Sequence, residues 1–263
     1  MIILGIHDGH NCGVSIFEDG KLLLALNEER ITRNKNEYGF PLQSINYCLK
    51  SQGIDLRAIE SIVYYEKPLI TFERLLETYL GTAPRGLRSF VSAMQVWLKE
   101  KLPIKSQLKK QFSSIQKDLK PGSDVKLPIF LFPEHHQSHA ASAFYPSPYQ
   151  KSAILCMDGV GEWATTSTWI GEGNHIKPLW EISFPHSLGL LYAAFTYYCG
   201  FKINSGEYKL MGLAPYGQPL YVKKIKDHLI DIKDDGTFRL DIDYFKFHRG
   251  FKMTSRKFHK LFS

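Results

Sequence analysis

Two histidines of the chain have the spacing of a metal-binding pair. His135 and His139 are four residues apart, so on a helix both imidazoles lie on one face and can bind the same metal ion, while His136 faces elsewhere. No glutamate stands between them, so the pair lacks the general base of the zinc-protease motif HExxH. Asp158, at the end of a later predicted strand, is the expected third ligand. The alternative is that these histidines only hydrogen-bond to carbonyl groups at a helix start.

The first apolar run of the chain ends in His7-Asp8-Gly9, whose residue types suit acid–base or phosphate chemistry. An adjacent histidine and aspartate can serve as a base and as the group that orients it toward a hydroxyl nucleophile. The glycine exposes backbone N–H groups, which suits an anionic phosphate. A polar hairpin turn without a catalytic role is the alternative.

Two further segments are rich in glycine and polar residues. Gly159 and Gly161 follow Asp158 and let the backbone approach a ligand closely, as in a phosphate-binding turn. Residues 201–217 form a long polar connection, and such loops are more often functional than core segments are. Three candidate ligand-binding residues stand close together in that connection: Asn204, Glu207 and Lys209.

A run of charged residues, from Glu28 to Lys35, follows the third predicted strand. Such a run is usually solvated surface. Because this one leaves a strand and precedes a helix, it can also present Lys35 or an arginine to a phosphate or carboxylate group.

Alternating apolar residues and turn signals place these candidates at the ends of regular elements. Asp19-Gly20 separates the two strands of a hairpin, and Pro41 and Gly53 bracket a helix. Residues 68–120 are predicted to be helical and residues 121–128 to be a linker. The predicted strands are residues 2–8, 13–18, 21–30, 59–66, 129–132 and three runs within 152–184, and the other predicted helices are residues 42–52, 135–144 and 187–198.

The order of elements repeats along the chain, since strands joined by tight turns are followed by a helix in both halves. This repetition resembles the architecture of actin, hsp70 and the sugar kinases, which holds nucleotide phosphates between two glycine-rich turns. The sequence therefore predicts an α/β, actin-like (ASKHA) fold of two ribonuclease-H-like subdomains. We expect the first at residues 1–150, with a helical insertion at about 66–127, and a second, incomplete subdomain at residues 151–263.

The composition is that of a folded, soluble domain, since 44% of the 263 residues are hydrophobic and 22% are charged, which excludes intrinsic disorder. The N-terminus lacks the basic region of a signal peptide. The longest apolar stretch, residues 188–201, is shorter than the ~20 residues of a membrane-spanning helix. Four cysteines are scattered without a CxxC pair, which indicates a reducing compartment. We therefore expect a cytoplasmic protein without a membrane partner.

The net charge of +7 is concentrated in one segment, because residues 81–127 contain ten lysines or arginines against three acidic residues. We interpret this segment as a solvated, lysine-rich helical insertion. A basic face for a membrane surface or for nucleic acid is the alternative. The segment lacks the interleaved aromatic residues of a nucleic-acid groove, so no nucleic-acid partner is expected.

Several stretches, in this order, resemble the N-terminal domain of the O-carbamoyltransferases, a family that includes nodulation-factor and antibiotic carbamoyltransferases. The resemblance covers residues 5–217, and only the insertion between residues 65 and 127 is uninformative. The matching stretches are GIHDGHN, EERITRNKNEYGFP, EHHQSHAASAFYPSP, MDGVGEWATTS and SLGLLYAAFTYYCGFKINSGEYKLMGLAPYG.

The resemblance implies a reaction and a set of roles. In this family, carbamoyl phosphate and ATP give carbamoyladenylate in a C-terminal domain, and the N-terminal domain transfers the carbamoyl group to a hydroxyl of a small-molecule or sugar acceptor in a biosynthetic pathway. That N-terminal domain is similar to the actin-like protein of tRNA threonylcarbamoyl-adenosine synthesis, and its HxxxH motif binds iron or a related divalent ion. By this match His135, His139 and Asp158 would bind iron, manganese or zinc. We expect His7, Asp8 and Lys35 to be catalytic, and a nucleotide or carbamoyladenylate to bind at Gly9, Gly159, Gly161, Asn204, Glu207 and Lys209.

The chain departs from the family pattern in two places. Asn36 stands where the family often has a histidine, and the sequence stops at Ser263, before the adenylate-forming domain that the resemblance requires. We therefore expect a fragment, or a split or degenerate member, that is inactive alone and needs the missing C-terminal domain as a partner. An actin-like sugar kinase or ATPase and a non-catalytic nucleotide-binding fragment are the alternatives. The sequence leaves the acceptor and the oligomeric state open.

Overall fold

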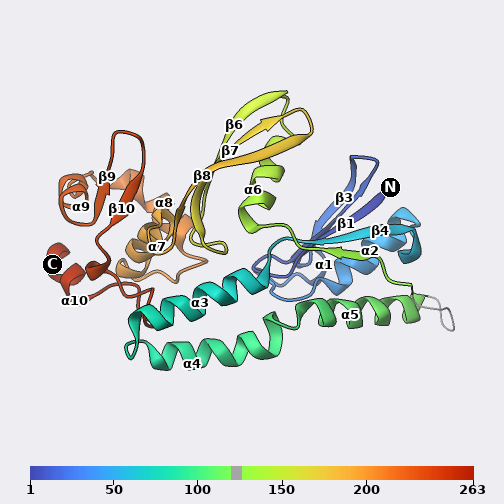
Figure 1. Ribbon diagram of the computed structural model, residues 1–263, viewed down its shortest axis with the longest axis horizontal. Coiled ribbons are helices and arrows are strands. Elements are labelled where there is room, and N and C mark those ends of the chain that lie inside the picture. The colour runs from blue at the N-terminus through green and yellow to red at the C-terminus, as the bar shows by residue number, and fades with distance from the viewer. Residues whose placement is uncertain (120–125) are drawn as a thin grey trace. The chain divides into compact units, whose positions relative to one another are not determined.

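The computed structural model describes residues 1–119 and 126–263, and Figure 1 labels its helices and strands. The predicted linker at 121–128 lies mostly outside the described residues. The described chain forms two compact units. Unit 1 comprises Met1–Lys67 and Leu98–His135, and unit 2 comprises Pro68–Trp97 and His136–Ser263. The predicted subdomain boundary after residue 150 stays a prediction.

Unit 1 is built on a five-stranded mixed sheet with the strand order β3-β2-β1-β4-β5. The first three strands form an antiparallel meander, and β4 and β5 continue the sheet parallel to β1. Asp19 and Gly20 adopt positive φ angles of 49° and 79° between β2 and β3, so the predicted hairpin is confirmed. The strands are β1 (Ile2–His7), β2 (Gly13–Glu18), β3 (Lys21–Asn27), β4 (Ile59–Tyr64) and β5 (Ile129–Leu131).

Two helices bury their apolar faces in the core of unit 1. The helix α2 (Leu42–Gln52) begins directly after Pro41 and ends at Gly53, whose φ of 64° is left-handed, as predicted. It contacts β2 and β3, and α5 (Ile104–Leu119) packs into the same core. This shared core anchors β1, whose end carries the candidate residues of the N-terminal loop. Its fully buried side chains include Leu4, Ile16, Ile45, Leu49, Ile62, Leu108, Phe112 and Ile115.

Glu28 belongs to the core of unit 1, although the sequence predicts it in a solvated charged run. The strand β3 ends one residue before it, and a helical turn, α1 (Glu29–Thr32), replaces the predicted strand end. Glu28 is 5% exposed, and its carboxylate accepts hydrogen bonds from the backbone N–H groups of Gln43 (2.9 Å) and Ser44 (2.7 Å). These groups belong to the first turn of α2, so a buried carboxylate caps that helix.

Unit 2 contains a three-stranded antiparallel sheet in the order β6-β7-β8 and a two-stranded sheet of β9 and β10. The helix α6 (His135–Phe144), whose bounds match the prediction, packs on the larger sheet. A Cβ atom on Gly171 would lie 2.5 Å from the ring of Phe144, so this glycine of β7 makes room for the helix. The strands are β6 (Lys151–Met157), β7 (Ala164–Glu172), β8 (His175–Ser183), β9 (Ile230–Ile232) and β10 (Phe238–Leu240).

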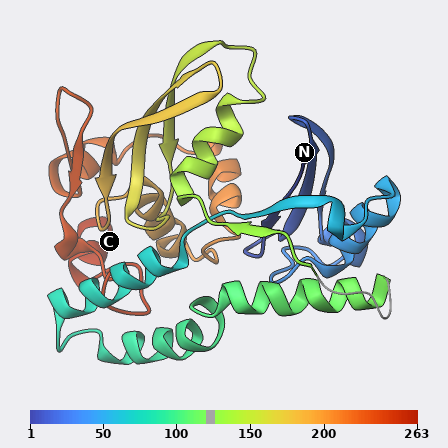
Figure 2. The ribbon, with the colours of Figure 1, turned by 45° about the vertical axis from the view of Figure 1, so that its right-hand side comes forward.

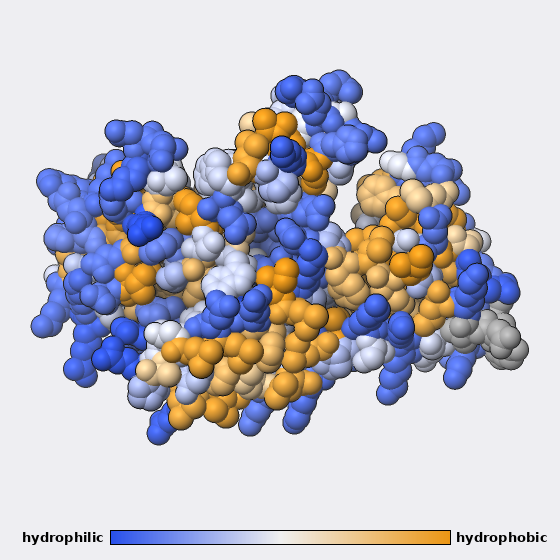
Figure 3. All heavy atoms as spheres, in the orientation of Figure 1, coloured by the Kyte–Doolittle hydropathy of each residue, from blue (hydrophilic) through white to orange (hydrophobic). Residues whose placement is uncertain are grey.

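The segment predicted as a solvated basic insertion also has an apolar face. The helices α3 (Pro68–Thr82) and α4 (Leu87–Val96) lie side by side as a hairpin (Figures 1 and 2). Leu80, Leu87 and Val91 are exposed there, and apolar side chains gather over the hairpin (Figure 3). The solvated lysines of the insertion include four on α5: Lys105, Lys109, Lys110 and Lys117.

The second half of unit 2 corrects one prediction and confirms another. The predicted helix after β8 is α7 (Leu188–Tyr198). The connection at residues 201–217, predicted as a loop, instead contains α8 (Glu207–Leu213) and a short 3-10 turn, Ala214–Tyr216. The reason is local, because the first residue of α8 itself accepts hydrogen bonds from the backbone just before it. The remaining helices are α9 (Val222–His228) and α10 (Arg256–Phe262).

The two units together confirm the predicted α/β class. In each unit an antiparallel meander, β1-β2-β3 or β6-β7-β8, is followed by helices, which is the repetition that the sequence indicates. Within residues 1–119 and 126–263, no helix combines the length and the apolar character needed to cross a membrane.

All four cysteines are free thiols, and their burial predicts their reactivity. Cys12, Cys48 and Cys156 are buried, whereas Cys199 is exposed. Burial raises the pKa of Cys12 and of Cys48 to about 11, which suppresses the reactive thiolate. We expect an alkylating reagent to label Cys199 rapidly in the folded protein and all four cysteines after unfolding without reductant. Mass spectrometry of the labelled peptides measures this, and a disulfide in the native protein would contradict it.

Candidate functional site

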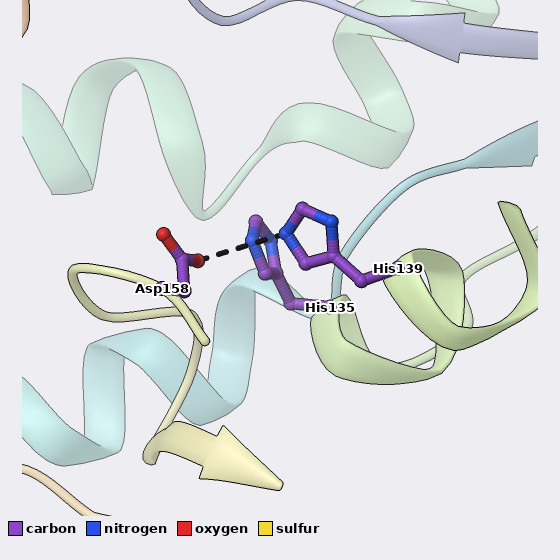
Figure 4. Close-up of side chains that lie close together, drawn as sticks. All are labelled: His135, His139 and Asp158. Carbon is purple, nitrogen blue, oxygen red and sulfur yellow. Dashed lines mark ion pairs between the residues drawn. The ribbon is translucent and has the colours of Figure 1, made fainter. Parts of the chain in front are cut away.

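The helix α6 and the turn after β6 bring three potential metal ligands together. The side chains of His135, His139 and Asp158 converge (Figure 4), and one ligand atom from each lies within 4.8 Å of the others. His139 Nε2 is 3.7 Å from Asp158 Oδ2. Ligand atoms on one ion lie about 3–4 Å apart, because metal–ligand bonds are about 2.0–2.2 Å long. The three residues therefore fit a divalent ion after side-chain movements of about 1 Å, and two imidazoles with a carboxylate suit iron, manganese or zinc.

The turn that carries Asp158 packs against the start of α7, backbone to backbone. Ser187 Oγ lies 3.0 Å from the carbonyl oxygen of Asp158 and 2.6 Å from that of Gly159. A Cβ atom on Gly189 would lie 2.5 Å from the Asp158 carbonyl oxygen, so the close approach requires glycine at that position. On the other side, the Asp158 N–H donates a hydrogen bond to the carbonyl of Thr165 at 2.8 Å. The backbone of Asp158 is thus fixed from two directions.

The glycines of the same turn use their N–H groups within the turn. The Gly159 N–H donates to Asp158 Oδ1 at 2.6 Å, and the Gly161 N–H donates to the carbonyl of Ala164 at 3.1 Å. A phosphate bound to either N–H group would have to take the place of these acceptors. The phosphate-binding role of Gly159 and Gly161 stays a prediction.

His136 directs its Nδ1 into the core, although the edge of its ring also contacts His139, with ring centroids 5.9 Å apart. It is 4% exposed, and its Nδ1 lies 2.6 Å from the hydroxyl of Ser167 on β7. The position agrees with the helical spacing, which directs this side chain away from the face shared by His135 and His139.

Glu66 and Tyr65 adjoin His135 within unit 1. Glu66 Oε2 lies 3.5 Å from His135 Nδ1, and both side chains are largely buried. The Tyr65 ring centroid is 5.7 Å from that of His135 and 4.5 Å from that of His7. A carboxylate beside one ring nitrogen commonly sets the tautomer and orientation of a metal-binding histidine. Glu66 has the position for that function, and Tyr65 contacts both candidate histidines.

The imidazole of His7 stands at the end of β1 in a space that Gly9 leaves open. A Cβ atom on Gly9 would lie 2.9 Å from His7 Nε2 and 3.6 Å from the hydroxyl of Tyr65. Burial lowers the pKa of His7 below its ordinary value of 6.5, although the carboxylates of Asp8 and Glu66 act in the opposite direction. His7 is therefore neutral at pH 7, the state in which an imidazole accepts a proton.

The carboxylate of Asp8 is 8% exposed and lies among polar groups from distant parts of unit 1. The Tyr64 hydroxyl donates a hydrogen bond of 2.6 Å to Asp8 Oδ1, and Lys101 Nζ lies 3.5 Å from both carboxylate oxygens. Burial raises the pKa of Tyr64 above its ordinary value, so its phenol stays protonated and can donate. The carboxylate of Asp8 thus accepts its shortest hydrogen bond from Tyr64, and Asp8 acts on His7 through its charge.

Lys35 is exposed in the turn after α1, and no ion pair joins it to another residue within the described ranges. The lysine beside Asp8 is Lys101. The catalytic role of Lys35 stays a prediction.

The three candidates lie at the start of α8: Asn204 just precedes this helix, and Glu207 and Lys209 belong to it. The Glu207 carboxylate accepts hydrogen bonds from the N–H groups of Asn204 at 2.9 Å and Gly206 at 3.2 Å. Asn204 has a left-handed φ of 63°, and the exposed Lys209 lies 6.0 Å from the ring centroid of Tyr208. Glu207 therefore has a structural function at the start of α8, and nucleotide binding by these residues stays a prediction.

Four residues of the site escape the sequence analysis: Tyr64, Tyr65, Glu66 and Lys101. The first three stand at the end of β4, and β4 pairs in parallel with β1, so both strand ends meet at one edge of the sheet. The sequence predicts both strands but not their pairing. The signal that the sequence offers for these residues is the run of polar side chains at the end of β4.

Comparisons with known proteins give one matching family model and several relatives. A family model described as the carbamoyltransferase N-terminus matches residues 2–263. Uncharacterized protein sll1178 of Synechocystis is 60% identical over 253 residues, which are 96% of this chain and 40% of that protein. Nodulation protein NolNO of Sinorhizobium fredii is 33% identical over 238 residues, which are 90% of this chain and 32% of that protein.

A more distant relative is uncharacterized protein MJ1051 of Methanocaldococcus jannaschii. It is 27% identical over 215 residues, which are 82% of this chain and 33% of that protein. The chain thus spans 32–40% of the length of these three relatives.

Proposed function

This chain belongs to the carbamoyltransferase family, whose N-terminal part it matches over residues 2–263, and we propose that it transfers a carbamoyl group to a hydroxyl of a small-molecule or sugar acceptor in a biosynthetic pathway. The donor in this proposal is carbamoyladenylate, made from carbamoyl phosphate and ATP by a C-terminal adenylate-forming part. The observation that carries the proposal is the buried cluster around His7 and Asp8, which has the groups that such a transfer needs.

In the proposed step, the acceptor hydroxyl oxygen attacks the carbamoyl carbon and forms a new C–O bond. The bond between that carbon and the phosphate oxygen of the adenylate breaks, and AMP leaves. The proton of the hydroxyl passes to His7, which its lowered pKa keeps neutral at pH 7. Tyr65 and Gly9 keep the imidazole in one place, which favours in-line attack because it reduces the freedom of the reacting groups.

We further propose that His135, His139 and Asp158 hold a divalent ion such as iron, manganese or zinc. When bound, the ion supplies positive charge for a developing oxyanion or for nucleotide phosphates. In the same proposal Lys35 contacts a phosphate or the oxyanion. The nucleotide part of the donor binds along polar and glycine residues: Gly9, Gly159, Gly161, Asn204, Glu207 and Lys209.

The fold offers an argument for the finer, actin-like assignment. The sheet of unit 1 has a three-stranded meander followed by two parallel strands, and unit 2 repeats the meander. We propose that the two meanders belong to two ribonuclease-H-like subdomains of an actin-like fold.

Supplying preformed carbamoyladenylate tests the proposed function. The chain, with and without an adenylate-forming part, is incubated with the donor and a panel of hexoses and oligosaccharides, and mass spectrometry follows O-carbamoyl products and AMP. We expect donor-dependent carbamoylation of a hydroxyl. We also expect no carbamoyladenylate from carbamoyl phosphate and ATP without the adenylate-forming part.

Two other outcomes replace the proposal with its alternatives. Transfer of the γ-phosphate of ATP to a sugar, without any carbamoyl product, assigns a sugar kinase. Binding of carbamoyladenylate without transfer to any acceptor, even with the adenylate-forming part present, assigns a nucleotide-binding module.

A further inference from the structure

We propose that Lys101, which the helical insertion supplies, is a positioning residue that holds the loop His7–Gly9 through the carboxylate of Asp8. The consequence for transfer rests on the proposed function above, whereas the contact and its contribution to stability do not. By this proposal the helical insertion contributes a residue to the candidate site itself.

The contact has the geometry of a buried ion pair shared by both oxygens. Lys101 Nζ lies 3.5 Å from Oδ1 and 3.5 Å from Oδ2 of Asp8, and the two side chains are 13% and 12% exposed. Because little water reaches either group, their mutual attraction is weakly screened.

Asp8 needs this partner because a buried carboxylate is costly unless its charge is compensated. The Tyr64 hydroxyl contributes one neutral hydrogen bond to Oδ1. Lys101 contributes the positive charge. Burial by itself lowers the pKa of Lys101, but Asp8 and Tyr38 outweigh it and raise that pKa above its ordinary value, so the ammonium ion keeps its charge.

Lys101 also lies close to the segment that precedes α2. Its Nζ lies 5.6 Å from the ring centroid of Tyr38, within the range of a cation–π contact. The next residue, Gly39, donates a backbone hydrogen bond of 3.0 Å to the carbonyl of Asp8. Lys101 therefore joins the loop after β1 to the segment before α2.

The insertion brings this lysine inward by an irregular turn. Trp97–Lys101 is π-helical, a conformation that changes the direction of the side chains and is frequent at functional sites. The Gln107 side chain donates a hydrogen bond of 2.9 Å to the carbonyl of Lys99, which ties this turn to α5. Beyond it the lysines of α5, such as Lys109, are exposed. Lys101 thus differs from its basic neighbours by its burial.

Thermal unfolding of the 263-residue chain tests the contact without any assay of activity. The variants are Lys101→Met, Asp8→Asn, the double variant and the exposed control Lys109→Met. We expect Lys101→Met to lower Tm by roughly 5–15 °C, and the double variant to lie no lower than the less stable single variant. Additive losses, or a Lys101→Met loss no larger than that of Lys109→Met, would overturn the pairing.

Chemical labelling of the wild type covers the case in which a variant does not fold. Acetylation of lysines, read by peptide mass spectrometry, should be slower at Lys101 than at Lys109 by a factor of about ten or more, because the ammonium is buried and paired. Equal rates at the two lysines would contradict the inference.

Steady-state kinetics with carbamoyladenylate then test the positioning role. We expect Lys101→Met to lower kcat by roughly 100-fold while the acceptor KM changes little, because a displaced loop misplaces the base. Lys101→Arg should recover part of kcat, and Lys101→Met should have no further effect in an Asp8→Asn background. Wild-type kcat in Lys101→Met overturns the role. A wild type without any transfer refutes the proposed function instead, and the unfolding result then decides on the pairing alone.

Discussion

Replacing His7 with alanine is expected to slow carbamoyl transfer by roughly 10²–10⁴-fold, the usual contribution of a general base. The effect should fall on kcat, because His7 is assigned to the proton of the acceptor hydroxyl rather than to the binding of the acceptor. Steady-state kinetics with carbamoyladenylate as the donor measure it. Lys117→Ala, on the exposed side of α5, is the control and should transfer at the wild-type rate.

The dependence of the rate on pH gives the same assignment a second readout. Burial lowers the pKa of His7 below its ordinary value of 6.5, so the neutral base predominates at pH 7 and is lost as the pH falls through the lowered pKa. The wild type should therefore lose kcat/KM on the acid side as the pH falls through the lowered pKa of His7, and His7→Ala should lack this limb. Full activity of His7→Ala would show that another group takes the proton.

The variant Gly9→Ala tests whether transfer depends on the position of the His7 ring, because it leaves the ring in the protein. The added Cβ atom would lie 2.9 Å from the His7 ring, so the ring must move although no functional group is removed. We expect a loss of kcat close to that of His7→Ala. An unchanged rate would mean that the observed position of the ring is not the one used in transfer.

The elements that sequence reasoning predicts best are those with local signals. The bounds of α2 are set by Pro41 and by the left-handed Gly53, and the β2–β3 hairpin is set by Asp19-Gly20. These residues act within a few positions of themselves, so one sequence contains the whole signal. The spacing of His135 and His139 is local in the same way, because one helix carries both.

The parts that escape prediction depend on contacts between distant segments. Tyr64 and Lys101 contact Asp8 from 56 and 93 positions away in the sequence. Contacts at such separations produce no periodic pattern in the sequence. Glu28 caps a helix that begins more than ten residues later, so its charge alone indicates solvated surface. In 201–217 the polar composition indicates a loop, whereas the Glu207 carboxylate starts a helix by binding the preceding backbone.

Removal of His135 or His139 is expected to abolish most binding of a divalent ion. Each alanine variant takes one of three potential ligands from a set whose ligand atoms lie within 4.8 Å of one another. Two remaining ligands hold an ion far more weakly, since affinity depends on the number of ligands and on their geometry. The measurement is metal content after dialysis against Mn²⁺, Zn²⁺ or, without oxygen, Fe²⁺, together with calorimetric titration.

The matched control for this experiment is His136→Ala on the same helix. His136 is 4% exposed and hydrogen-bonds to Ser167 in the core, so its removal should lower Tm but leave the metal content near that of the wild type. Glu66→Gln removes the charge beside His135 Nδ1 and should weaken metal affinity by roughly 10–100-fold without abolishing it. Because affinity is read on folded protein without any acceptor or donor, the result does not depend on the transfer reaction. Equal metal content in His135→Ala, His136→Ala and His139→Ala would refute the metal site. The helix face that His135 and His139 share would then not bind the ion.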